Sequence, residues 1–165
     1  MSIKRIGRHL VQHRWRVRKV FPAQVLSRIE QAIKMGEHAH SGRVRFVVEG
    51  ALDGAPLLRN QPARERALDI FSHLRIWDTQ HNNGVLIYLL LADRDVEIVA
   101  DRGIDAKVGL AGWDRICREM ESEFRAGKFE SGVINGIAAV SRELATHFPA
   151  HGPHRNELPD KPVAD

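Results

Sequence analysis

The chain has 165 residues, of which 43% are hydrophobic and 28% are charged, a balance that is typical of a globular protein and excludes wholesale disorder. It contains one cysteine, which excludes an internal disulfide and a cysteine-rich metal site. The longest apolar run, over 85–92, is far shorter than the ~20 residues that cross a bilayer, and the sequence shows no secretory signal, so we expect a cytoplasmic protein.

The positive charge is concentrated at the N-terminus. Seven of the 25 basic residues and none of the 21 acidic residues lie in 1–20, so the remainder has a small net negative charge. Apolar residues recur there at roughly helical spacing, which predicts a basic, helical N-terminal arm over 1–20. Its apolar stripe can pack on the domain, or residues 1–19 can dock peripherally on an anionic membrane surface or a partner. Nucleic acid is not an expected partner, because the rest of the chain has no basic face.

A domain is expected over 21–149, followed by a polar, proline-containing tail over 150–165 that is extended or loose. The run VLIYLLL over 85–91 is apolar on both faces, which is typical of a central strand covered on both sides. Spacing and turn residues predict the other elements. They are helices over 22–36 and 62–74, strands over 43–49 and 96–100, and two helices that flank Gly127.

This order of elements predicts an α/β fold. The first strand, its crossover helix and the central strand form a βαβ unit, which requires parallel pairing and a right-handed crossover. The third strand returns antiparallel across a hairpin. We therefore expect a three-layer α/β/α sandwich with a small mixed β-sheet that helices cover on both faces.

The predicted hairpin brings polar loops together at one end of the sheet. With Asp93-Arg94 as a two-residue turn, Gly84 faces Gly103, and the loop 77–83 lies beside 101–105. Oxygen-rich side chains there suit Ca²⁺ or Mg²⁺, and an arginine suits a phosphate or carboxylate. Ordinary turn and capping chemistry is the alternative interpretation of the same residues. The polar residues at this end are Asp78, Asn82, Asn83, Asp101, Arg102 and Asp105.

The segment from about Arg64 to Phe148 resembles the TPM-domain family. The resemblance rests on Asn83-Gly84-Val85-Leu86 entering an apolar strand, on Asp93-Arg94 at the turn, and on Asp101-Arg102-Gly103-Ile104 after the third strand. It implies an α/β/α sandwich with a polar cleft near the Asn-Gly loop. Members of the family have been associated with divalent-cation binding and with acid phosphatase activity. Others look like accessory factors of membrane complexes and accompany LemA-type membrane proteins.

Carried onto this chain, the resemblance and the hairpin together give three sets of site residues. The metal ligands are expected to be Asp78, Asp101 and Asp105. Catalytic roles fall to Asp78, Asp101 and Arg102. Further contacts to a bound cofactor are expected from Asn82, Asn83, Gly84 and Gly103.

Two functions follow from these expectations. The first is a binding or accessory module, whose cleft holds Ca²⁺ or Mg²⁺ and which acts with a membrane-associated partner of the LemA type. The alternative is a metal-dependent acid phosphatase that hydrolyses phosphomonoesters, with Arg102 clamping the phosphoryl group. We favour the binding module, because the sequence offers no evident covalent nucleophile and only two or three carboxylates can reach one point.

Overall fold

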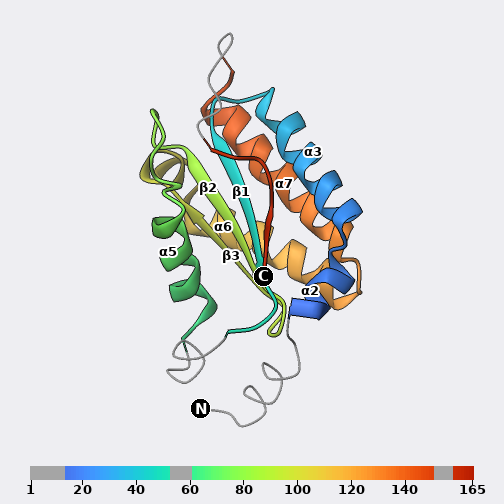
Figure 1. Ribbon diagram of the computed structural model, residues 1–165. Helices are drawn as coiled ribbons and strands as arrows, with labels where there is room; N and C mark the ends of the chain where they lie inside the picture. The colour runs from blue at the N-terminus through green and yellow to red at the C-terminus, as the bar shows by residue number, and fades with distance from the viewer. Residues whose placement is uncertain (1–13, 53–60, 151–157) are drawn as a thin grey trace.

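The computed structural model describes residues 14–52, 61–150 and 158–165, and Figure 1 shows the arrangement of its helices and strands. Helices and strands appear in the predicted order, with a short strand added at the C-terminus. The elements are α2 (Arg14–Val20), α3 (Ala23–Glu37), β1 (Arg43–Glu49), α5 (Ala63–His73), β2 (Gly84–Leu90), β3 (Asp95–Ala100), α6 (Arg102–Arg125), α7 (Phe129–His147) and β4 (Val163–Ala164).

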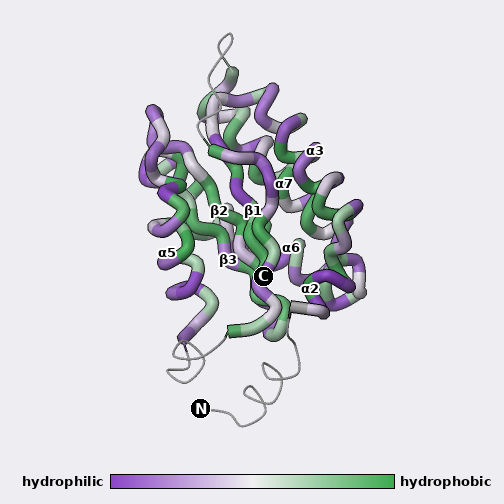
Figure 2. The backbone as a smooth tube through the Cα atoms, viewed as in Figure 1, coloured by the Kyte–Doolittle hydropathy of each residue, from purple (hydrophilic) through white to green (hydrophobic). Residues whose placement is uncertain are grey.

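The four strands form one mixed sheet in the order β3-β2-β1-β4. β1 pairs parallel with β2, and β2 pairs antiparallel with β3, so the predicted βαβ unit and hairpin are both confirmed. α5 covers one face of the sheet, whereas α3, α6 and α7 cover the other (Figure 1). The fold is thus a three-layer α/β/α sandwich. Every residue of β2 is buried, as its apolar run predicts, and the hydropathy colouring shows the strands as the apolar centre (Figure 2).

The basic helix α2 packs on the larger of the two hydrophobic clusters. Val17 is 1% exposed and belongs to that cluster together with Phe21, whose ring contacts the rings of Phe46 and Phe129. The part of the arm that the structure describes therefore packs through its apolar side, while Trp15 stays 58% exposed. Residues 1–13 of the expected arm lie outside the described residues.

The hairpin register differs from the prediction by two residues. Leu86 pairs with Val99, and Gly84 lies opposite Asp101, whose N–H donates to the Gly84 carbonyl at 2.9 Å. The expected pairing of Gly84 with Gly103 was wrong because the connection has four residues, 91–94. A two-residue turn of the common hairpin type needs positive φ at both central residues, and here Arg94 alone has it, at 54°. A shift of two residues leaves each side chain on its predicted face.

The end of the tail is tied to the sheet. Val163 and Ala164 pair with Val47 and Val48, and the N–H of Gly50 donates to the carbonyl of Asp165. Val163–Ala164 therefore form a strand, with bends at Leu158 and Lys161 before it, whereas 151–157 of the expected tail lie outside the described residues. Within the described part of the chain, no helix is both long and apolar enough to span a bilayer.

Candidate functional site

The two predicted loops do meet at one end of the sheet. A Cβ added at Gly103 would lie 2.5 Å from the carbonyl oxygen of Asn82 and 2.7 Å from that of His81, so only glycine fits there without a backbone shift. The N–H of Ile104 donates to the same Asn82 carbonyl at 3.3 Å. The backbone around Asn82, with φ of 51°, is thereby held against the start of α6. We call residues 82–84 and 101–103 the polar edge.

Asp101 caps α6 and is buried at the polar edge. Its Oδ1 accepts a hydrogen bond from the N–H of Arg102 at 2.7 Å, which satisfies one of the open donors of the helix N-terminus. The residue is 7% exposed, and its Oδ2 is buried without a hydrogen-bond partner among the described residues. One carboxylate oxygen therefore has a structural role and the other has none that the structure reveals.

Asn83 immediately precedes β2 and is fully buried. Its N–H donates to Thr79 Oγ1 at 3.1 Å, its carbonyl accepts from the N–H of Arg43, and its Nδ2 donates to Ser41 Oγ at 3.5 Å. The Oδ1 atom is buried and has no hydrogen-bond partner in the described part of the chain. Asn83 precedes Gly84 and Asp101 lies opposite Gly84, so both residues lie at the same end of the sheet, with their side chains on opposite faces by strand alternation.

The other two predicted carboxylates hold different partners. Asp78 is exposed and forms an ion pair with Arg75 at 2.7 Å. The exposed Asp105 accepts a hydrogen bond from Trp113 Nε1 at 3.0 Å, across the break in α6 at Gly109. Residues 14–52, 61–150 and 158–165 contain no group of three or more His, Cys, Asp or Glu side chains placed to hold a metal ion.

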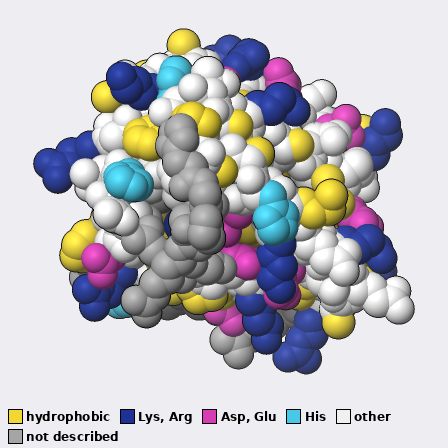
Figure 3. All heavy atoms as spheres, turned by 90° about the horizontal axis from the view of Figure 1, so that it is seen from above, with side chains coloured by type: hydrophobic (Ala, Val, Ile, Leu, Met, Phe, Trp, Pro, Cys, Tyr) yellow, Lys and Arg dark blue, Asp and Glu magenta, His cyan; other side chains and the backbone are white. Residues whose placement is uncertain are grey.

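Arg102 is exposed and follows Asp101 at the start of α6. Seen from above, acidic and basic side chains are interspersed at this end of the molecule, and neither sign forms a continuous patch (Figure 3). The polar edge thus offers buried oxygens below a surface of mixed charge.

A buried carboxyl that the sequence interpretation overlooked lies close to this edge. Glu37 is 8% exposed, its Oε1 accepts from the N–H of Val44 at 3.2 Å, and its Oε2 lies 3.6 Å from Arg43 Nη1. Burial raises the pKa of Glu37 to about 7; the Val44 N–H and Arg43 oppose this shift, and a hydrogen-bonded Asp160 reinforces it. Glu37 continues the i, i+4 spacing of the buried Ile29 and Ile33. This spacing is the sequence pattern from which the burial of Glu37 could have been predicted.

Comparison with known proteins identifies the family. A model of the TPM domain matches residues 17–143. The chain belongs to the TPM-domain family. The match also takes in α3 and β1, which precede the segment from about Arg64 on which the sequence resemblance rests. A comparison with proteins of curated function found no match.

Two solved structures share this TPM fold. The NMR structure of the BA42 protein from the psychrophilic bacterium Bizionia argentinensis is 30% identical, with a TM-score of 0.75 over 86% of this chain and 92% of that one. The N-terminal domain of a P. gingivalis protein, also solved by NMR, is 21% identical, with a TM-score of 0.60 over 75% of this chain and 76% of that one. The second likeness shows the fold alone.

Proposed function

We propose that this TPM domain is a non-catalytic binding module that takes a divalent cation, Ca²⁺ or Mg²⁺, at the polar edge. The observation that carries the proposal is the buried Oδ2 of Asp101, which has no hydrogen-bond partner among the described residues. A buried polar atom left unsatisfied costs about 1–3 kcal/mol, and more when it is charged. A cation bound to that oxygen would remove this cost, since hard cations prefer carboxylate and carbonyl oxygens.

Asp101 would hold the cation through its buried Oδ2. One side-chain oxygen fills only a small part of the six to eight positions that Ca²⁺ takes. Water, or oxygen atoms of a partner, would complete the set. This shortage of protein ligands favours a site that links the domain to another molecule, and a membrane-associated partner of the LemA type stays a prediction.

Cation binding is tested by the melting temperature at increasing Ca²⁺ or Mg²⁺ in the wild type and in Asp101→Asn. At a concentration about 100 times the dissociation constant, the cation should add about 2.7 kcal/mol of stability, which is a rise of roughly 5–10 °C for a domain of this size. Asparagine still caps the helix but removes the charge, so the variant should fold and lose the rise. Asp78→Asn is the matched control and should keep it, because Asp78 is exposed and paired with Arg75. An equal rise in Asp101→Asn would contradict the proposal.

A metal-dependent phosphatase is the second candidate, and the exposed Arg102 next to the buried Asp101 favours it. An arginine beside a metal-bound carboxylate can clamp a phosphoryl group. Two of the three predicted metal ligands argue against a phosphatase, because Asp78 pairs with Arg75 and Asp105 accepts a hydrogen bond from Trp113. Of the three, Asp101 has a buried oxygen without a hydrogen-bond partner among the described residues.

Turnover of p-nitrophenyl phosphate with Mg²⁺ or Ca²⁺ distinguishes the two functions. We expect the wild type to hydrolyse it no faster than Asp101→Ala does. A rate in the wild type that falls at least 100-fold in Asp101→Ala and in Arg102→Gln would overturn the non-catalytic proposal and establish the phosphatase.

A further inference from the structure

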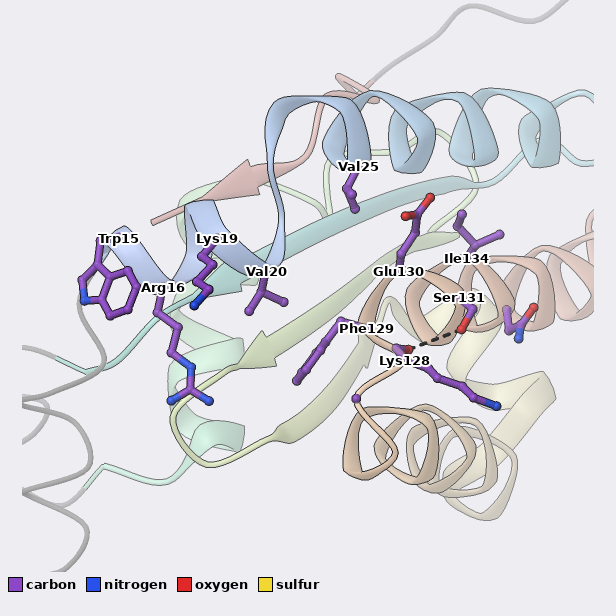
Figure 4. Close-up of a pocket in the computed structure, with 12 residues that line it drawn as sticks. Trp15, Arg16, Lys19, Val20, Val25, Lys128, Phe129, Glu130, Ser131 and Ile134 are labelled. Carbon is purple, nitrogen blue, oxygen red and sulfur yellow. Dashed lines mark hydrogen bonds between the residues drawn. The ribbon is translucent and has the colours of Figure 1, made fainter.

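A groove of about 900 Å³ lies between α2 and the first turn of α7 (Figure 4). α2 lies at the other end of the molecule from the start of β1 and β2, where the polar edge is (Figure 1). Its apolar lining includes Val20 from α2 and Phe129 and Ile134 from α7. Phe129 stacks on Phe124 with ring centroids 5.3 Å apart, and Phe124 is fully buried. The lining is therefore anchored to the core and keeps its shape.

Cationic side chains lie on both sides of this apolar lining. Arg16 and Lys19 come from α2, and Lys128 comes from the residue before α7 (Figure 4). None of the three has an ion-pair partner among the described residues. Lys19 Nζ lies 5.7 Å from the centroid of the Trp15 ring, which also lines the groove.

The acidic residue of the lining is already neutralised. Glu130 is paired with Arg28, whose Nη2 donates to Glu130 Oε2 at 2.9 Å and whose Nε donates to Oε1. The Arg28 partner holds the pKa of Glu130 below its ordinary value, so the carboxylate stays ionised and engaged. The charge that the groove presents to a ligand is therefore positive.

We propose that this groove docks the domain on an anionic phospholipid bilayer. Lipid phosphates would lie between Arg16, Lys19 and Lys128, and the glycerol region would contact the apolar lining. Trp15 is 58% exposed at the rim, and tryptophan favours the level of the lipid headgroups. The sequence before α2 contains basic residues and no acidic one, which adds to the positive charge of this part of the chain. The proposal does not depend on cation binding at the polar edge.

Cosedimentation of the full chain with vesicles tests this docking. Binding to vesicles of phosphatidylglycerol and phosphatidylcholine should be strong, and binding to phosphatidylcholine alone should be weak. Arg16→Gln/Lys19→Gln should weaken binding to the anionic vesicles about 30-fold, which corresponds to about 1 kcal/mol for each cationic side chain. The fluorescence of Trp15 should move to shorter wavelength on binding, and Trp15→Phe should abolish most of that change.

The matched control removes the same charge elsewhere. Lys107 and Arg142 are exposed on α6 and α7. Both lie about 20 Å or more from Lys128, the cationic residue of the groove that is nearest to them along the chain, from the rise of about 1.5 Å per residue. Lys107→Gln/Arg142→Gln should change binding less than threefold at 0.1 M salt, because charges beyond ~10 Å are screened. Equal losses in the two double variants would overturn the proposal, since net charge alone would then explain binding. Tight binding of a soluble acidic peptide without binding to vesicles would also overturn it and assign the groove to a protein partner.

Discussion

Gly84→Ala should destabilise the domain by about 3 kcal/mol, at the upper end of what overpacking costs. A Cβ at this position would lie 2.0 Å from the carbonyl oxygen of Ile76 and 3.1 Å from its carbonyl carbon. Both atoms belong to the backbone, so no side-chain rotation relieves the contact. Gly84 also begins β2 opposite Arg43 and accepts the hydrogen bond of Asp101, so a shift would displace the polar edge. Urea unfolding followed by circular dichroism measures the effect.

Gly112→Ala is the control for this substitution. Gly112 lies inside α6, and an added Cβ would meet a side-chain atom, Val108 Cγ1, rather than backbone. Alanine gains roughly 0.5–1 kcal/mol over glycine inside a helix, which offsets the adjustment of that valine. We expect a change within about 1 kcal/mol. Equal stabilities of Gly84→Ala and Gly112→Ala would contradict the close approach of Gly84 to the Ile76 carbonyl.

Glu37→Gln should stabilise the domain at pH 8 by about 3 kcal/mol and leave its stability at pH 4 nearly unchanged. The pKa of Glu37 is raised from 4.5 to about 7, mainly by burial, so the folded state binds its proton more tightly than the unfolded state. The contribution of Glu37 to the free energy of unfolding is therefore greatest below about pH 4.5. It falls as the pH rises to about 7 and stays low above that pH. Each unit of pKa shift corresponds to about 1.4 kcal/mol.

Glutamine reproduces the protonated form of Glu37 and removes its titration. Its amide oxygen can accept from the N–H of Val44, and its amide nitrogen can donate to Asp160. Free energies of unfolding between pH 4 and pH 8 should therefore vary less steeply in Glu37→Gln than in the wild type. Glu65→Gln, on the exposed side of α5, should leave the profile parallel to that of the wild type. A parallel profile for Glu37→Gln itself would show that Glu37 is ionised in the fold at neutral pH.

The layers of the fold could be predicted because each strong pattern had a single explanation. The run 85–91 is apolar on both faces, and its only stable place is the middle of a covered sheet. The hairpin register could not be predicted, because it depends on the φ of Arg94 rather than on the residue types at the turn. β4 has two residues, too few for any periodicity.

The candidate site was predictable in position and only partly in composition. The sequence placed Asp78, Asp101 and Asp105 near one end of the sheet without distinguishing them. Their partners depend on contacts outside that pattern, Arg75 for Asp78 and Trp113 for Asp105. The groove could not be predicted, because its two walls come from α2 and α7, which are separated by more than 100 residues in the sequence.

Binding of a divalent cation at the polar edge is tested most directly by titrating Ca²⁺ into ¹⁵N-labelled protein and following the amide resonances. We predict saturable shifts at residues 82–84 and 101–103 and at the side-chain amide of Asn83, all lost in Asp101→Asn. Shifts that do not saturate by millimolar Ca²⁺, or that concentrate away from Asn83 and Asp101, would contradict the cation site.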